Sequence, residues 1–192
     1  MNFDDADLEI FERWVKVSVG LARFNTHVTV VVQGLGRLDA QLRSADRRLV
    51  QNYAAKGEVL NDPDYLQDHL LHSYLWVLGA YELLRTLTSW VREGKGGLTE
   101  EDLANLTHAR NRFERLRIPL AKMEAAKRHR DTDGEIAYPG IDAAMGIAWQ
   151  LNADLFVSRG ELSEVFLETL EGIRASFLRR AGDASEKISP RL

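Results

Sequence analysis

Residues 10–49 read IFERWVKVSVGLARFNTHVTVVVQGLGRLDAQLRSADRRL, and apolar side chains recur along them at alternating spacings of four and three. This 3.5-residue period is typical of a helix that keeps one apolar seam against a partner helix. The seam comprises Ile10, Trp14, Val17, Leu21, Phe24, Val28, Val31, Leu35, Leu38, Leu42, Ala45 and Leu49. We therefore expect one long, heptad-patterned first helix over residues 5–55, which would measure about 75 Å.

Two features of this stretch oppose a straight helix. Val28–Val32 is β-branched throughout, and Gly34 and Gly36 each cost about 1 kcal/mol relative to alanine in a helix interior. The alternative is a strand over Val28–Val32 that leads into a phosphate-binding turn at Gly34-Leu-Gly36. Asp39 and Ala40 stand where a dinucleotide-binding fingerprint needs its third glycine. The apolar period also crosses the glycines without a change of phase, so we favour a helix with a possible bend near Gly34.

Two more helices follow from capping and breaking residues. Pro63 begins the second helix behind the capping residue Asp62, and the helix ends near Glu93. Thr99 caps a third helix, which Pro119 should kink because proline removes a backbone donor.

The periodicity changes after the third helix. Residues 131–160 contain four glycines, and Ile147–Leu151 alternates with the period of a strand. Residues 152–154 are turn-forming and Leu155–Val157 is again strand-like, which predicts a small β-hairpin. Ser158–Glu161 then forms a capping box that begins the last helix.

The predicted fold is mainly α. It is an antiparallel helical bundle of four main helices, with a small β-hairpin inserted before the last one. We assign residues 1–180 to a single domain, with residues 131–160 as its non-helical insert. The polar residues 181–192 are expected to form a disordered tail.

The first helix is expected to exceed the second in length, because the second would span only about 46 Å. Part of the seam would then lack an intrachain partner, and so much apolar surface rarely faces water. We therefore expect a homodimer. Its predicted interface comprises Leu21, Phe24, Val28, Val31, Leu35, Leu38 and Leu42.

Composition excludes several classes of protein. The chain has no cysteine, which excludes disulfide scaffolds, iron–sulfur sites and thiol catalysis. We found no signal peptide and no apolar run long enough to cross a membrane, so a cytoplasmic protein without membrane contact is expected. His69 and His72 share a helix with Asp68, but no third ligand is evident from another helix. We therefore predict no metal and no cofactor.

Positive charge is concentrated in residues 108–130. Eight cations stand there against two carboxylates, a local charge of +6 in a chain whose net charge is −4. The cations are Arg110, Arg112, Arg115, Arg117, Lys122, Lys127, Arg128 and Arg130. Such a surface can bind RNA or an acidic protein. Alternatively, its arginines pair with acidic residues of the same fold, such as Glu100 or Glu101. Only Phe113 and Tyr138 lie near enough in sequence to offer base stacking.

Within this basic region, residues 110–115 read Arg-Asn-Arg-Phe-Glu-Arg and resemble the Arg-Asn-x-x-x-His motif of the HEPN superfamily. The resemblance covers six residues. It implies a helical, often dimeric protein of bacterial toxin, phage-defence or RNA-processing type. In active members, the arginine and histidine of the motif from two protomers form a metal-independent ribonuclease site, so the resemblance implies Arg110, Asn111, Arg115 and His108 as its residues here. Arg115 stands where the family has histidine, and arginine cannot act as a general acid or base near neutral pH. His108 precedes the motif instead.

No other catalytic motif supports an enzyme. A nucleophile elbow, a Walker sequence and the Glu-x-x-His pattern of di-iron helical proteins are all absent from the sequence. The leading hypothesis is a non-enzymatic, homo-oligomeric interaction protein of a bacterial cytoplasm. The alternatives are a HEPN-like ribonuclease, or a small-molecule pocket lined by Tyr138, Trp149 and Phe156.

Overall fold

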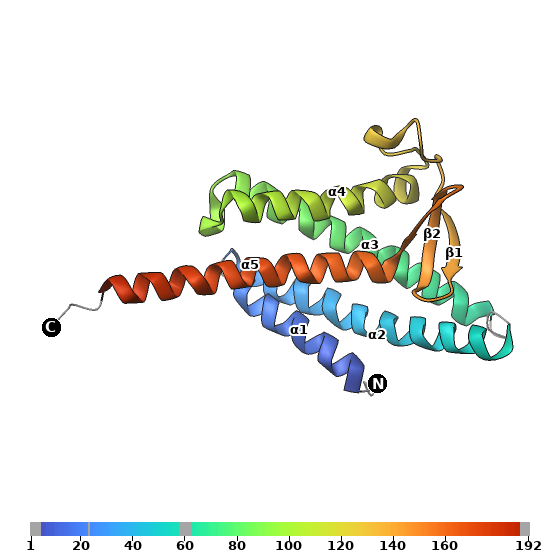
Figure 1. Cartoon of the computed structure of the whole chain (residues 1–192), viewed down its shortest axis with the longest axis horizontal. Coiled ribbons are helices and arrows are strands. Elements are labelled where there is room, and N and C mark those ends of the chain that lie inside the picture. The colour runs from blue at the N-terminus through green and yellow to red at the C-terminus, as the bar shows by residue number, and fades with distance from the viewer. Residues whose placement is uncertain (1–4, 23, 58–62, 189–192) are drawn as a thin grey trace.

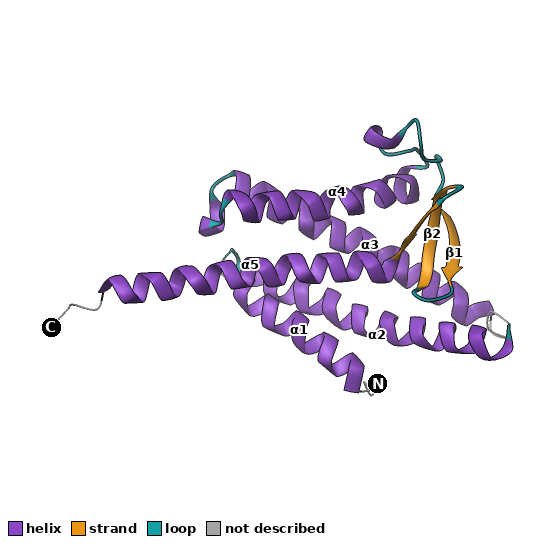
Figure 2. Cartoon of the chain, in the orientation of Figure 1, coloured by secondary structure: helices purple, strands orange, loops and turns teal. Residues whose placement is uncertain are grey.

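The structure, a computed structural model, describes residues 5–22, 24–57 and 63–188. Its helices are α1 (Asp5–Leu21), α2 (Thr26–Lys56), α3 (Pro63–Arg92), α4 (Glu100–Lys122) and α5 (Arg159–Ile188), with 3₁₀ turns η1 (Lys95–Gly97) and η2 (Lys127–His129). Its strands are β1 (Tyr138–Asp142), β2 (Gly146–Asn152) and β3 (Leu155–Ser158). The chain is mainly helical, and a small antiparallel sheet precedes the last helix, as predicted (Figure 2).

The predicted first helix is in fact two helices, so the structure has five long helices instead of four. α1 ends at Leu21, and α2 begins after Asn25, whose side-chain oxygen accepts the backbone N–H of His27 at 2.9 Å. The chain reverses at this turn, and α1 and α2 lie side by side (Figure 1). The apolar period hid the turn because it continues in the sequence from Leu21 through Phe24 to Val28, at spacings of three and four.

Gly34 and Gly36 both lie inside α2, which excludes the strand-and-turn alternative. A Cβ atom added to Gly36 would lie 2.3 Å from Cβ and Cγ of Trp14, whereas nothing lies within 4 Å of the same position at Gly34. Gly36 therefore serves the close approach of α1 to α2, because any larger residue would overlap the Trp14 side chain.

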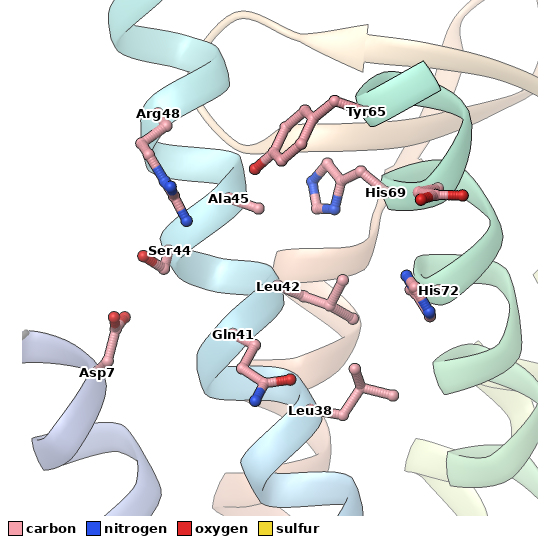
Figure 3. Close-up of a pocket in the computed structure, with 11 residues that line it drawn as sticks. Asp7, Leu38, Gln41, Leu42, Ser44, Ala45, Arg48, Tyr65, His69 and His72 are labelled. Atoms are coloured by element: carbon pink, nitrogen blue, oxygen red, sulfur yellow. The ribbon is translucent and has the colours of Figure 1, made fainter. Parts of the chain in front are cut away.

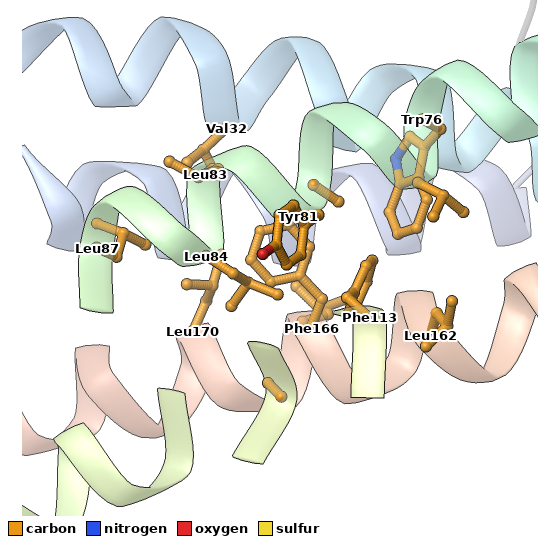
Figure 4. Close-up of a cluster of buried hydrophobic side chains, with 14 of the residues drawn as sticks. Val32, Trp76, Tyr81, Leu83, Leu84, Leu87, Phe113, Leu162, Phe166 and Leu170 are labelled. Atoms are coloured by element: carbon orange, nitrogen blue, oxygen red, sulfur yellow. The ribbon is translucent and has the colours of Figure 1, made fainter. Parts of the chain in front are cut away.

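The core is centred on aromatic rings from four helices. Trp14 of α1, Trp76 of α3, Phe113 of α4 and Phe166 of α5 are all fully buried. Phe166 meets the rings of Trp14 and Phe113 edge to face, at centroid distances of 5.3 and 5.8 Å. Figure 4 shows Phe113 and Phe166 among the surrounding leucines. Such pairs add about 0.5–1.5 kcal/mol each beyond the burial of apolar area.

The predicted helix starts are confirmed where the structure describes them. Thr99 forms a reciprocal capping box with Asp102. Ser158 and Glu161 form another, since the N–H of each residue donates to the side chain of the other. The predicted cap Asp62 lies outside the described residues. α5 continues to Ile188, past the start of the expected polar tail at residue 181.

The sheet has three strands where the sequence predicted two. β2 is central, and its neighbours β1 and β3 are both antiparallel to it. β1 escaped prediction because it contains Pro139 and Gly140, which both lower strand propensity. Proline is tolerated there because β1 is an edge strand, where a missing N–H breaks no ladder.

Candidate functional site

Two arginines of the basic region are engaged within the fold. Arg115 of α4 donates from Nε and Nη2 to the two carboxylate oxygens of Asp133, at 2.7 Å each. These hydrogen bonds hold the pKa of Asp133 below its ordinary value. Arg117 lies over the ring of Tyr81, 5.1 Å from its centroid, and within 3.7 Å of Glu82. The alternative of intrachain pairing thus describes these two residues, although with acidic partners other than those suggested by the sequence.

The motif that resembles that of the HEPN superfamily, residues 110–115, lies within α4. Arg110 Nη2 donates to Oδ1 of its neighbour Asn111 at 3.0 Å. Arg110 Nε is buried, and it has no hydrogen-bond partner among the described residues. His108 is exposed and precedes Arg110 by two residues on α4.

The remaining cations face solvent. Arg112, Lys127, Arg128 and Arg130 are exposed, and none of them has an ion-pair partner within the described ranges. Lys122 is also exposed and lies 3.7 Å from Glu124. We call residues 127–130 the basic loop. It follows α4 and projects beyond the helices (Figure 1).

The basic loop is fastened to one end of the sheet. The N–H of Asp133 donates to the carbonyl oxygen of His129 at 2.8 Å, and the N–H of Gly134 donates to the carbonyl oxygen of Leu151 at 2.6 Å. Asn152, the last residue of β2, also donates from its side chain to Asp133 at 3.2 Å. These bonds place the cations of the loop beside the end of β2 that leads to β3.

A second charged site, entirely buried, was missed by the sequence reasoning. Arg159, the first residue of α5, has a fully buried side chain. Its Nη1 donates to Asp39 Oδ1 and its Nη2 to Asp46 Oδ2, at 2.6 Å each. Asp39 also accepts from Trp14 Nε1 at 3.0 Å, and Asp46 shares a hydrogen bond of 2.8 Å with His69 Nε2. We call these residues the buried charge network, which joins α1, α2, α3 and α5.

Opposite charges stabilise the ionised groups of the buried charge network, and Arg43 Nε also donates to Asp39 Oδ2 at 3.0 Å. Burial lowers the pKa of Arg159, but the carboxylates of Asp39 and Asp46 outweigh it and raise that pKa overall. Burial likewise raises the pKa of Asp46, but the hydrogen bond with His69 and the charge of Arg159 hold it below its ordinary value. The N–H of Ile147 donates to Asp46 as well, at 3.0 Å. Since each charged group has protein partners, the network fits a structural role better than a ligand site.

The sequence carried one signal for this network. Asp39 and Asp46 are seven residues apart and directly follow the seam residues Leu38 and Ala45. They therefore occupy equivalent positions on one face of α2. No local pattern indicated that Arg159 would reach both carboxylates, because it lies more than 110 residues further along the chain.

A cavity of about 670 Å³ lies among α1, α2 and α3 (Figure 3). Tyr65, His69 and His72 project from α3 toward Leu42 and Ala45 of α2. No group of three or more His, Cys, Asp or Glu side chains that could hold a metal ion occurs in the described part of the chain. His69 is instead part of the buried charge network.

The aromatic residues proposed for a small-molecule pocket do not come together. Trp149 is 2% exposed and belongs to the core. Tyr138 and Phe156 are exposed, and strand alternation places both of them on the opposite face of the sheet from Trp149. Phe113, named for stacking, is fully buried in the core.

Most residues of the predicted dimer seam are buried or partly buried by contacts within the chain. Leu21, Val28 and Leu42 are buried. Phe24, Leu35 and Leu38 are partly buried against the core. Val31 is 49% exposed and borders a hollow of about 320 Å³ between α2 and α3. α3 supplies part of this cover, since Trp76 donates to the carbonyl oxygen of Leu35 and Gly79 lies against the Leu35 side chain.

No helix among the described residues is both long enough and apolar enough to cross a membrane. Comparison of the chain with protein-family models, with curated proteins and with solved structures finds no match.

Proposed function

We propose that this protein binds RNA through its basic loop and acts as an interaction protein instead of an enzyme. One observation carries the proposal. Lys127, Arg128 and Arg130 are exposed and have no ion-pair partner within the described residues, whereas Arg115 and Arg117 are engaged in the fold. Cations that stabilise no part of the fold remain free to bind phosphates.

The neighbouring charges set the expected strength of binding. Asp131 and Glu135 follow the basic loop and are exposed. They reduce the local positive charge, so we expect moderate affinity with contacts to about three phosphates. For single strands, the logarithm of the binding constant falls with that of salt concentration at a slope of about −0.7 per phosphate contact. Three contacts therefore predict a slope near −2.

The test is a fluorescence-anisotropy titration of a labelled RNA at several salt concentrations. The variant Lys127→Ala/Arg128→Ala/Arg130→Ala should lose most of the affinity and most of the salt dependence. A matched control, Lys16→Ala/Arg37→Ala/Arg92→Ala, removes three exposed cations from other helices and should bind as the wild type does. Equal losses in both variants would show that only net charge matters and would overturn the proposal.

The same samples separate two other functions. Cleavage of the RNA by the wild type, lost in Arg110→Ala, would establish the ribonuclease activity that the HEPN resemblance implies. Polyglutamate that binds to the basic loop while RNA does not would indicate an acidic protein partner. Intact RNA with salt-sensitive binding supports the proposal.

A homodimer is the second part of the proposal. Val31 is 49% exposed and lies with Val28, Leu83 and Trp90 around the hollow between α2 and α3. This is the part of the predicted seam that the fold leaves open, so we place the contact between copies there. Analytical ultracentrifugation should give a dimer at micromolar concentration and a monomer for Val31→Asp. A wild-type monomer under those conditions would refute this contact.

A further inference from the structure

One row of side chains crosses the sheet on its outer face. Tyr138 of β1 pairs with Gln150 of β2, which in turn pairs with Phe156 of β3. Laterally paired residues of antiparallel strands project from the same face. Tyr138 is 61% exposed and Phe156 is 51% exposed. Two aromatic rings therefore face solvent on either side of a glutamine, at one end of this face, whereas Ala148 and Ser158 further along it are buried.

We propose that this row is a stacking platform for unpaired bases of single-stranded RNA. The inference rests on the RNA binding proposed above and adds the class of RNA and the residues that select it. Exposed aromatic rings on a rigid sheet offer flat apolar surfaces that bases of any sequence can cover. The strands hold the rings in place, so little conformational entropy is lost when the RNA binds.

The spacing of the rings favours a splayed single strand. Neighbouring strands lie about 4.8 Å apart, so the backbones of Tyr138 and Phe156 are about 10 Å apart. Bases in a duplex are stacked about 3.4 Å apart along a strand. Their faces are covered, and two rings side by side cannot reach them. Unpaired bases can separate and lie on one ring each.

Gln150 lies between the rings and supplies a polar group. Its side chain makes no hydrogen bond with any other described residue. An amide presents both donors and an acceptor, so it can bind the edge of a base held on either ring. Such a contact would give a modest base preference over otherwise sequence-tolerant stacking.

The cations of the basic loop favour RNA as the ligand of this face. It is fastened to the same end of the sheet through Gly134 and Leu151, and β1 begins eight residues after Arg130. A strand whose bases lie on the rings can thus place its phosphates beside the cations. Asp131 and Glu135 limit the electrostatic attraction, so stacking must supply much of the affinity. An apolar protein partner would not complement the charge of the adjoining cations.

The test measures the affinity of the full-length protein for a labelled ten-nucleotide single strand and for the corresponding duplex. Removing an aromatic stacking partner weakens binding by about fivefold or more per base, so Tyr138→Ala/Phe156→Ala should bind the single strand about 30-fold more weakly. Tyr138→Phe/Phe156→Tyr keeps both rings and should bind normally. Leu71→Ala/Leu75→Ala removes comparably exposed apolar side chains from α3 and should have no effect.

A further readout separates stacking from an indirect effect on folding. Phe156→Trp should show quenched tryptophan fluorescence when the single strand binds, and circular dichroism should show unchanged melting for the alanine variant because both rings are exposed.

The outcomes also separate this inference from the function on which it rests. Equal binding of single strand and duplex, with no loss in Tyr138→Ala/Phe156→Ala but a loss in the basic-loop variant, would overturn the platform and leave RNA binding intact. Absence of any RNA binding by the wild type would overturn both. A strong preference for the single strand that depends on the rings establishes the platform.

Discussion

Arginines in two regions of this molecule have opposite roles. Arg159 is fully buried and binds two carboxylates of α2, while Arg128 and Arg130 of the basic loop are exposed and unpaired within the described chain. Arg115 lies between these extremes, since it is partly exposed and binds one buried carboxylate. The comparison teaches that the position of an acidic partner, more than the arginine itself, decides whether a cation stabilises the fold or remains available for binding.

The partners of Arg159 explain why it turns inward. Asp39 and Asp46 lie on one face of α2, and the start of α5 passes directly across that face. Gly146 of the sheet also lies against Asp46, where a Cβ atom would come within 2.4 Å of Asp46 Oδ1. Helices α1, α2, α3 and α5 and the sheet thus enclose the charges. The basic loop has no such enclosure because it projects past the end of α4 (Figure 1).

The largest effect is expected for Arg159→Met. Removing the cation leaves Asp46 buried without its counter-charge and leaves Asp39 with Arg43 alone, and breaking such a buried pair costs about 3–5 kcal/mol. Urea unfolding followed by circular dichroism measures the loss. Arg128→Met is the matched control, and it should change the free energy of unfolding by less than about 0.5 kcal/mol. Similar values for the two variants would remove the contrast between the regions.

The next effect concerns the close approach of α1 to α2. Gly36→Ala should destabilise the protein by about 1–3 kcal/mol, because its Cβ would overlap Trp14. Gly34→Ala meets open space and should stabilise α2 by up to about 1 kcal/mol through helix propensity alone. Thermal melting of the two variants gives the comparison. A Gly36→Ala variant as stable as Gly34→Ala would show that the approach is looser than described.

A smaller effect depends on pH. The pKa of Asp133 is lower in the folded protein than its ordinary value near 3.8, chiefly because of the hydrogen bonds from Arg115. A lowered folded pKa contributes stability above the ordinary value, and that contribution is lost as the pH falls through the folded pKa. Arg115→Gln should therefore be less stable than the wild type at pH 6, by about 1 kcal/mol or more. The difference should shrink as the pH falls through the folded pKa of Asp133, because the carboxyl group then becomes protonated in both proteins. A difference that is constant with pH would assign the loss to packing alone.

The smallest effect on stability is expected for Lys127→Ala/Arg128→Ala/Arg130→Ala. Exposed cations without partners contribute little to folding, so the free energy of unfolding should stay within about 0.5 kcal/mol of the wild type. Urea unfolding of this variant and of Arg159→Met compares how much the two regions contribute to the free energy of unfolding. A loss above about 1 kcal/mol would mean that the basic loop helps to hold the fold.

The sequence predicted those features that depend on local patterns. The capping boxes at Thr99 and Ser158 and the helical course of α2 through Gly34 follow from neighbouring residues, and the structure has them. The turn before Asn25 was not predicted because it keeps the apolar phase, so periodicity alone cannot reveal it. β1 was not predicted because Pro139 lowers strand propensity, although an edge strand tolerates proline.

The candidate sites also differ in how far they could be predicted from the sequence. The cations of the basic loop are adjacent in sequence and were predicted as a group. The buried charge network and the row of Tyr138, Gln150 and Phe156 join residues that are distant in sequence, and only the fold brings them together. Phe113 is near the basic region in sequence, but it is buried because α4 turns that face toward the core. Contacts between elements therefore set the limit of the sequence reasoning.

The central claim is that the outward cations bind RNA, and the salt dependence of that binding tests it most directly. The binding constant of the wild-type protein for a labelled single strand should fall about 20-fold between 50 and 200 mM salt, as three phosphate contacts require. The basic-loop variant should show little of this dependence. Binding that changes less than about twofold over the same range, or that the variant retains in full, would contradict the account.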